Sequence, residues 1–260
     1  GVVALKALFT GERLKAFIIP RIEEVTHRTV ALNSISLSIL PALAVEVDGL
    51  SVSNKQGEGF SGKPMLQLDK LVLDVRLLAL LKGNLEVSTM TLEHPQIFLE
   101  VNEKGEANYA EQEAVRSPGV DTTRNRVSGE SSKPSTTGRV DVKSGGYGLL
   151  LSNLQIINGT LEYVDRKGNS STTLDGMNHN VRVDAPAGGN EVTIETRSTI
   201  ERFSYGSLTT PLVSNLKCGL NLTMLYDTKR DLLKLLPGTA SVQEIQLNMS
   251  GDVATCTVVP

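Results

Sequence analysis

The feature that most constrains this chain is an alternation of apolar and polar residues in its C-terminal half. Every second residue between positions 216 and 224 is apolar: Leu216, Cys218, Leu220, Leu222 and Met224. Successive side chains of a β-strand point to opposite faces, so this segment is predicted to form a strand with one apolar and one polar face. Such an apolar face has to be covered by another element, by curling of the sheet or by a ligand.

The same period of two recurs along most of the chain and predicts a mainly β fold with long antiparallel strands. Before residue 110, strands are expected at 30–39, 45–52, 66–77, 85–92 and 97–101. After residue 145, they are expected at 149–157, 160–165, 172–183, 191–203, 212–225 and 241–259. The phase of the alternation slips at Asp69–Lys70, which predicts a β-bulge there.

Only one segment of useful length has a helical pattern. Apolar residues recur at three- and four-residue spacing near the N-terminus: Leu14, Phe17, Ile18, Ile22 and Val25. Pro20 lies inside this pattern and is expected to kink the helix. Short helical segments are also predicted at Leu77–Leu81 and at Asp227–Leu236, the second ended by Pro237 and Gly238. One helix cannot cover so many strands, so we expect the sheet to curl or to bind a ligand.

Residues 111–144 interrupt the pattern. They contain no Leu, Ile, Met or aromatic residue and are rich in Ser, Thr, Pro, Gly and charged residues. Such a segment cannot bury enough apolar surface to offset its ordering entropy, and we interpret it as a disordered linker or long loop. It separates a helix-plus-sheet region at 1–110 from a continuing antiparallel sheet at 145–260, without necessarily dividing the fold.

A weak internal repeat links the two regions. Residues 92–105 (LEHPQIFLEVNEKG) and residues 156–168 (IINGTLEYVDRKG) share one pattern, a strand, a sharp turn, a second strand and a polar turn. The match is imperfect by one residue. We interpret the two segments as repeated hairpins and not as a strict repeat.

The composition excludes several functional classes. A formal net charge of -3 and a pI near 5.7 leave no basic surface for nucleic acid. Cys218 and Cys256 have no CxxC spacing and no neighbouring His, so no metal site is predicted, and the two could form one disulfide or stay separate thiols. Gly-x-Ser-x-Gly and phosphate-binding glycine loops are absent, and carboxylates are scattered singly. We therefore expect no catalytic residues, no cofactor and no enzyme activity.

The first residues, Gly1–Phe9, are apolar but too few to span a bilayer, which takes about 20 residues. They could be the end of a membrane helix or a simple packed segment. The codons upstream of Gly1 would decide between these two readings.

Several motifs resemble the AsmA family. The segment Thr26–Leu32 (THRTVAL) is similar to the family's TGRPV-L signature, with His27 in place of the usual Gly and Thr29 in place of the usual Pro. Three further segments are similar to its SL-LLP-L-L---GV-V-N, L-PLL-G and L--P-I-L--N-DG--NW patterns: Ser36–Asn54, Leu77–Gly83 and Leu92–Tyr109. The resemblance is strong over residues 10–110, looser over 148–165 and thin afterwards.

The resemblance implies a periplasmic protein, held in the inner membrane of a Gram-negative bacterium by an N-terminal helix that this sequence lacks. The family is related to TamB-like and chorein-like bridge proteins, whose sheets curl into a long apolar groove, and it is not known as an enzyme. We therefore expect a curled, groove-like sheet that binds or conducts phospholipid for outer-membrane biogenesis. The residues chosen for the groove are Leu73, Val75, Leu216, Leu220 and Leu222.

An alternative function is that of an assembly scaffold. An open sheet edge can bind an extended segment of another protein by strand addition, and outer-membrane proteins would be the clients. The sequence patterns above are compatible with either function.

Overall fold

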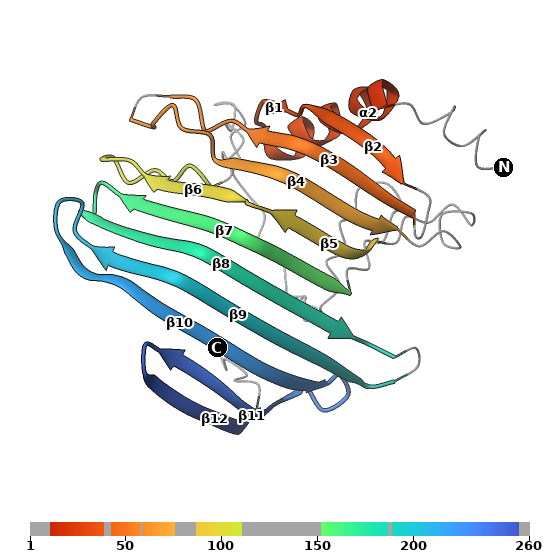
Figure 1. The fold of residues 1–260 in the computed structure, drawn as a ribbon, viewed down its shortest axis with the longest axis vertical. Helices are drawn as coiled ribbons and strands as arrows, with labels where there is room; N and C mark the ends of the chain where they lie inside the picture. The colour runs from red at the N-terminus through yellow and green to blue at the C-terminus, as the bar shows by residue number, and fades with distance from the viewer. Residues whose placement is uncertain are drawn as a thin grey trace, which may run out of the picture.

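The computed structural model describes residues 11–38, 43–57, 59–75, 87–110, 152–186 and 189–254. This part of the chain begins with one helix, α2 (Gly11–Thr26), and continues into a single large sheet (Figure 1). The strands are β1 (Val30–Ala31), β2 (Ser34–Ser38), β3 (Leu43–Val52), β4 (Leu66–Val75), β5 (Val87–Glu93), β6 (Gln96–Val101), β7 (Asn153–Asp165), β8 (Ser170–Asp184), β9 (Glu191–Gly206), β10 (Pro211–Asp227), β11 (Leu232–Val242) and β12 (Ile245–Ala254). The predicted mainly β class is confirmed.

The strand order is β1-β3-β4-β5-β7-β8-β9-β10-β11-β12, with β2 paired to β3 and β6 paired to β4 and β7. The predicted antiparallel pairing holds along most of the sheet and fails at one place, because β5 and β6 both pair with β7 in parallel. Parallel neighbours need a long crossover connection, and the chain between Val101 and Asn153 supplies it. Strands from both sides of that connection therefore belong to one sheet.

The helix predicted at Asp227–Leu236 is wrong. Residues 228–231 form a turn, and β11 begins at Leu232 and pairs with both β10 and β12. Pro237 lies where the register of β11 shifts between Leu235 and Gly238, which is a position where a strand tolerates a proline. Pairing on both sides overrides the helix propensity of the leucine-rich segment.

The bulge predicted at Asp69–Lys70 is also wrong. The register between β3 and β4 runs without a shift from Leu66 to Val75. The change of phase coincides with a change in the neighbouring strand, because Gly49 of β3, opposite Asp69, has a φ of 63°.

The repeated segments 92–105 and 156–168 are not hairpins. β5 passes into β6 in the same direction through His94 and Pro95, and β7 continues through Asn158. The two segments lie side by side in parallel, with Leu92 paired to Ile156 and Ile97 to Leu161. The sharp turn that each motif predicts is a kink inside a continuing strand.

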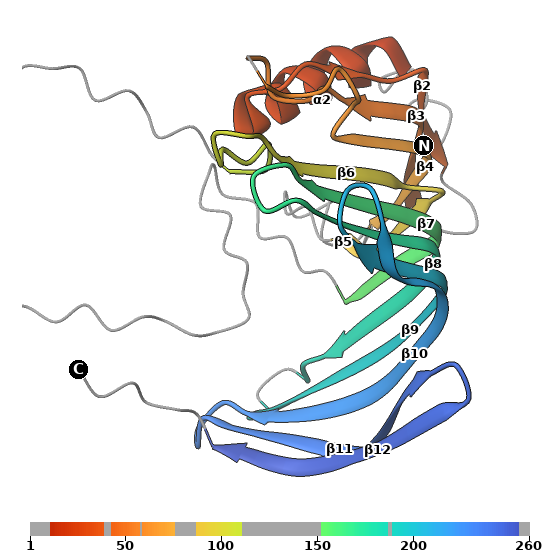
Figure 2. The same cartoon turned by 90° about the vertical axis from the view of Figure 1, so that its left-hand side faces the viewer.

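These kinks form a line across the sheet, which we call the kink line. It consists of residues that lie in the left-handed region or contact such a residue in the neighbouring strand: Gly49, Asp69, His94, Asn158, Gly176, Glu201, Lys217 and Gln243. A left-handed residue inside a strand bends it. Figure 2 shows β9 and β10 bent along their length, with both ends of each strand on the same side.

The helix α2 covers one end of the sheet. The buried cluster there contains Val30, Ile35, Val47, Leu50, Val52 and Leu68, and Leu14, Ile19 and Ile22 of α2 pack against it. Leu14 and Ile22 thus belong to the predicted apolar stripe. Pro20 lies inside α2, which continues to Thr26.

Other predictions fall outside the described residues: the N-terminal segment 1–9, the turn at Leu77–Leu81 and the linker at 111–144. Across the ranges that are described, no helix is both long and apolar enough to cross a bilayer.

Candidate functional site

The faces of the sheet can be assigned from the strand pairing. Residues that are directly paired carry their side chains on the same face, so successive pairs define rows across the strands. One row runs through Leu37, Val45, Leu73, Met90, Leu154, Val181, Thr196 and Leu222. The next contains Ile35, Val47, Leu71, Leu92, Ile156, His179, Ser198, Leu220, Ala240 and Leu247. We call the face that bears these rows the apolar face.

A third row lies on the other side of the kink line: Val30, Val52, Leu66, Ile97, Leu161, Leu174, Phe203 and Leu216. Val30 and Val52 of this row share the buried cluster under α2 with Ile35 and Val47 of the second row. The third row therefore belongs to the same face. On β3, β7 and β8 a left-handed residue lies between the second and third rows (Gly49, Asn158 and Gly176), and between β9 and β10 the register shifts between Leu216 and Cys218.

The structure places all five predicted groove residues on the apolar face. Leu73 and Leu222 lie in one row, Leu220 lies in the next row, and Leu216 lies in the row beyond the kink line. Val75 pairs with Leu43 and Val87 and is buried. Leu73 and Val75 are carried by β4, whereas the other three are on β10, so the residues share a face and not a compact site.

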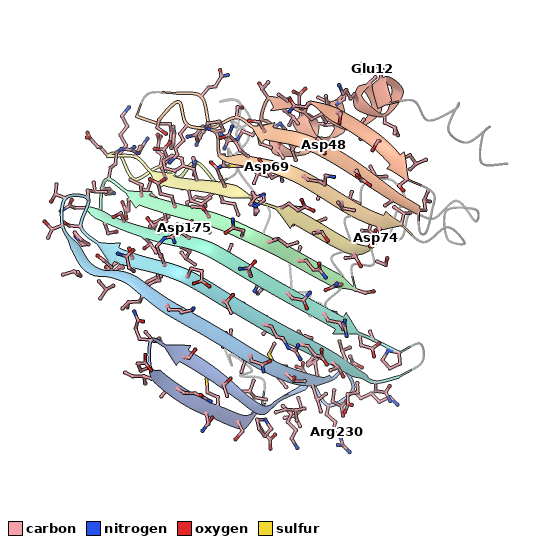
Figure 3. All side chains as sticks on the ribbon, viewed as in Figure 1. Glu12, Asp48, Asp69, Asp74, Asp175 and Arg230 are labelled. Carbon is pink, nitrogen blue, oxygen red and sulfur yellow. The ribbon has the colours of Figure 1, made fainter. Side chains whose placement is uncertain are left out.

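The opposite face is polar. Its paired residues in the middle of the sheet are Gln155, Asn180, Arg197, Asn221 and Thr239. Ion pairs join further residues of this face, such as Lys70 with Glu46 and Arg202 with Asp175. Figure 3 labels Asp48, Asp74 and Asp175, which belong to this face by their pairing.

Within the described residues, the apolar face is covered at the end where α2 lies. Ile35 and Val47, which lie beneath α2, are each 4% exposed. In the same row Leu247 of β12 is 57% exposed, and its neighbour Ile245 is 66% exposed. Among the described residues, α2 packs on the part of the sheet formed by β1 to β4. The apolar residues of β8 to β10 are half-buried, and those of the β11–β12 hairpin are exposed.

A hollow of about 630 Å³ lies against the middle of the sheet. Its lining comes from β7, β8, β9, β10 and β11 and includes the polar-face residues Gln155, Asn180, Arg197, Asn221 and Thr239. Ile156, His179, Ser198 and Leu220 of the second row lie between this polar row and its neighbour, so the hollow belongs mainly to the polar face. His179 Nδ1 and Ser198 Oγ are joined by a short hydrogen bond. This pair is the polar interruption of an otherwise apolar row.

A second polar cluster links residues before position 110 to residues after position 152. The Glu100 carboxylate of β6 is fully buried and accepts hydrogen bonds from Asn54 Nδ2 (2.6 Å) and the backbone N–H of Ser61 (2.8 Å). Arg166, in the turn after β7, pairs with its other oxygen. Burial alone would raise the pKa of Glu100, but the hydrogen bonds from Arg166, Ser61 and Asn54 hold it below its usual value. Glu100 is therefore ionised and paired at neutral pH.

Asn108 and Arg28 extend this cluster. Asn108 Nδ2 donates to Asn54 Oδ1 and to the backbone oxygen of Phe98, both at 3.0 Å, and its own Oδ1 accepts from the backbone N–H of Glu100 at 2.9 Å. The Arg28 guanidinium, just after α2, donates to the backbone oxygen of Asn108. The cluster thus connects the end of α2, the end of β3, β6 and the turn after β7.

A comparison with protein-family models matches the AsmA family over residues 2–210. The chain belongs to the AsmA family. A search of curated proteins gave no match.

The residues that carry the AsmA motifs converge in the second cluster. Arg28, Asn54 and Asn108 come from three separate motifs and are linked by hydrogen bonds. Asn102 from the last motif is also fully buried, and its side chain bonds to Glu106. The AsmA motifs therefore contribute residues to the second polar cluster, which we call the junction. They do not mark the exposed part of the apolar face.

Sequence reasoning missed two features of this AsmA chain. His179 was not assigned a role, although the alternation already places it on the apolar face between Met177 and Val181. Glu100 was not assigned a role, and its partner Arg166 is remote in the sequence. Within the described part of the chain, no group of three His, Cys, Asp or Glu residues could hold a metal ion. Cys218 is a free thiol on the apolar face, and Cys256 lies outside the described residues.

Proposed function

We propose that this AsmA chain binds phospholipid acyl chains on its apolar face and in this way handles lipid during outer-membrane biogenesis. The observation that carries the proposal is the set of apolar rows that crosses the sheet, half-buried on β8 to β10 and exposed at Val242, Ile245 and Leu247 of β11 and β12. Acyl chains laid along these rows would be removed from water, and each buried CH₂ contributes about 0.8 kcal/mol. The polar face would remain in water.

The groove is part of this proposal. β9 and β10 are curved so that both ends of each strand lie toward one side (Figure 2), and a curved sheet with its apolar face on the inside would shield a lipid from water on more than one side. Binding by shape and apolar contact needs no catalytic group, so the proposed activity is non-enzymatic. Leu73, Val75, Leu216, Leu220 and Leu222 are proposed contact residues.

We further propose the periplasm as the location, with attachment to the inner membrane through a helix that precedes the present sequence. Support comes from AsmA family membership, since lipid movement toward the outer membrane starts at the inner membrane. The lipid would then pass from the membrane onto the exposed part of the apolar face. Fractionation of cells that express the complete gene product would test this location.

Native mass spectrometry tests the lipid proposal. The chain is expressed in a Gram-negative bacterium, purified without detergent and sprayed intact. We expect bound species with phospholipid masses, and we expect them to be lost in Leu220→Asp/Leu222→Asp. The matched control is Asn221→Asp/Thr223→Asp, which adds the same charges to the polar face of the same strand and should keep the lipid. A wild-type chain without lipid would refute the proposal.

The exposed strand β12 supports the second candidate, a scaffold that binds outer-membrane proteins by strand addition. Among the described strands β12 pairs with β11 alone, and Ile245 and Leu247 are the most exposed apolar residues of that hairpin. The test is retention of denatured barrel proteins by the immobilised chain. Lysines at the edge oppose strand addition, so Ile245→Lys/Leu247→Lys should abolish retention if this candidate is right. A chain that binds lipid and retains no barrel protein excludes it.

A further inference from the structure

The end of the hairpin formed by β9 and β10 is apolar and exposed. It consists of residues 203–216, which we call the hairpin tip, and Figure 1 shows it projecting at the edge of the sheet. Four of its large apolar side chains are exposed, Tyr205, Leu208, Leu212 and Val213, and Leu212 is the most exposed at 76%. A group of exposed apolar side chains marks a contact with a partner or a membrane.

The hairpin tip also lacks charge. Its sequence, FSYGSLTTPLVSNL, contains no Asp, Glu, Lys, Arg or His. The turns after β7 and β10 do carry charged residues, at 166–167 and 229–231. Charge would oppose the transfer of a turn into an apolar environment, and the hairpin tip is free of this obstacle.

The charged residues that border the hairpin tip are both basic. Arg202 precedes it on β9, and Lys217 follows it on β10. Each pairs with a solvent-accessible carboxylate, Arg202 with Asp175 and Lys217 with Glu201, and such surface pairs are weak. From its end inward the hairpin thus carries leucine, tyrosine and then a cation. Segments that insert into the interface of a bilayer have the same order.

The apolar side chains of the hairpin tip point to both sides of the hairpin. Tyr205 is paired with Val213, so these two side chains share one face. Leu212 is adjacent to Val213 in the strand and points to the opposite face. A protein that packs on one face would leave the other apolar side in water. A bilayer surrounds an inserted tip on all sides, and we therefore favour a bilayer over a protein surface.

The edge of the hairpin tip is unsuited to strand addition. The pairing of β10 with β11 begins at Cys218, so within the described sheet residues 211–216 pair with β9 alone. Pro211 has no N–H to donate, and Asn215 is left-handed with a φ of 56°. The register with β9 also shifts along this stretch. Proline and bulges at an edge oppose pairing with a further strand, which disfavours an extended protein segment as the occupant.

We propose that the hairpin tip inserts into the surface of a phospholipid bilayer. Leu208 and Leu212 would reach the boundary of the acyl chains. Tyr205 would lie at the level of the headgroups, where the amphipathic tyrosine ring is preferred. The long side chains of Arg202 and Lys217 would face the lipid phosphates.

The hairpin tip is continuous with the apolar face. Tyr205 lies two residues from Phe203, which is paired with Leu216 in the third row. A lipid that leaves the bilayer at the tip would therefore pass directly onto the apolar rows. The inference rests on the proposed function for the purpose of this contact, and it goes beyond that function by naming the surface at which lipid enters.

A single fluorescent reporter tests the insertion. The chain has no Trp, so Leu212→Trp introduces the only one. We expect its emission to shift to shorter wavelength on addition of phosphatidylethanolamine–phosphatidylglycerol vesicles and to be quenched by lipids brominated on their acyl chains. Ile157→Trp is the matched control, because Ile157 is also exposed but lines the hollow on the polar face. Its emission should not change.

Co-sedimentation with the same vesicles measures how much the hairpin tip contributes to binding. We expect Leu208→Asp/Leu212→Asp to lower the partition coefficient at least about tenfold, because two buried apolar side chains are replaced by charges. The control Ile245→Asp/Leu247→Asp makes the same change on the exposed β11–β12 hairpin and should leave the partition coefficient unchanged. Equal losses in both variants, or an unquenched Leu212→Trp, overturn the inference.

Native mass spectrometry of the same proteins separates this inference from the proposed function. A wild-type chain that carries phospholipid but does not bind vesicles overturns the insertion of the hairpin tip, while the lipid-binding face stands. A chain that binds vesicles through the hairpin tip and carries no phospholipid supports the insertion and overturns the proposed function alone.

Discussion

His94 and Asn158 lie at the same point of two parallel neighbouring strands, and both have a left-handed backbone, with φ values of 49° and 51°. The backbone N–H of His94 donates to the oxygen of Ile157 at 2.9 Å, directly beside this pair. Two segments that are remote in the sequence thus carry the same kink in register. The kinks of these two strands lie side by side, between the second and third apolar rows.

Substitutions of Asn158 test whether the backbone is left-handed at this kink. A β-branched residue is strained at positive φ, whereas glycine is not. We expect Asn158→Val to lower the free energy of unfolding by about 1–3 kcal/mol and Asn158→Gly to leave it within about 0.5 kcal/mol, measured by urea denaturation. Gln155→Val in the same strand is the control for the introduction of valine. An Asn158→Val variant as stable as this control would show that the left-handed backbone is absent.

A substitution of Gly176 tests the kink line on the neighbouring strand, β8. It has a φ of 63°, and an added Cβ would lie 2.8 Å from the Cβ of Glu201. We expect Gly176→Ala to lower the free energy of unfolding by about 1–3 kcal/mol. Gly251→Ala is the matched control, because a Cβ at Gly251 meets nothing within 4 Å. Equal effects of the two substitutions would contradict the geometry of the kink line.

A substitution of Glu100 tests how much the junction contributes to the free energy of unfolding. Its removal leaves the Arg166 guanidinium without its carboxylate partner and takes away the side-chain acceptor of Asn54 Nδ2 and of the Ser61 N–H. We expect Glu100→Ala to lower the free energy of unfolding by about 3 kcal/mol. The control is Glu162→Ala, because Glu162 pairs with Lys63 at the surface and should contribute less than about 1 kcal/mol.

The acid dependence of stability follows from the same carboxylate. Because the pKa of Glu100 is lower in the folded chain than in the unfolded chain, its ionised form stabilises the fold. That contribution is complete above the ordinary glutamate value of 4.5 and is lost as the pH falls below it toward the folded-state pKa. We expect Glu100→Gln to reduce the slope of the free energy of unfolding against pH in this window. An unchanged slope would mean that Glu100 is not held ionised by its partners.

The alternation of residues could predict the faces of the sheet but not the neighbours of each strand. Leu73 and Leu222 were both assigned to the apolar face from their spacing, and pairing places them in one row. The parallel contact of β5 with β7 could not be predicted, because the connection between Val101 and Asn153 has no apolar pattern that reports its path. The leucines after Asp227 fit a helix and a strand equally well, and pairing with β10 decided the outcome.

The sequence indicated the junction only through the AsmA motifs that contain its residues. Asn54 and Asn108 look like ordinary turn residues, and nothing in their spacing shows that they contact one another. The kinks had a local signal, since Asn158-Gly159 and His94-Pro95 are turn-forming dipeptides. These dipeptides correctly predicted a local change of backbone direction. The prediction that the chain reverses there to form a hairpin was wrong.

Photo-crosslinking on β10 tests the central claim that the apolar face carries acyl chains. A photoreactive amino acid is placed at Leu222 or at Thr223, adjacent residues whose side chains point to opposite faces. Cells are irradiated, and the purified chain is analysed for covalently attached phospholipid. We predict lipid adducts at position 222 and none at position 223. Adducts at neither position, or equal adducts at both, would contradict the claim.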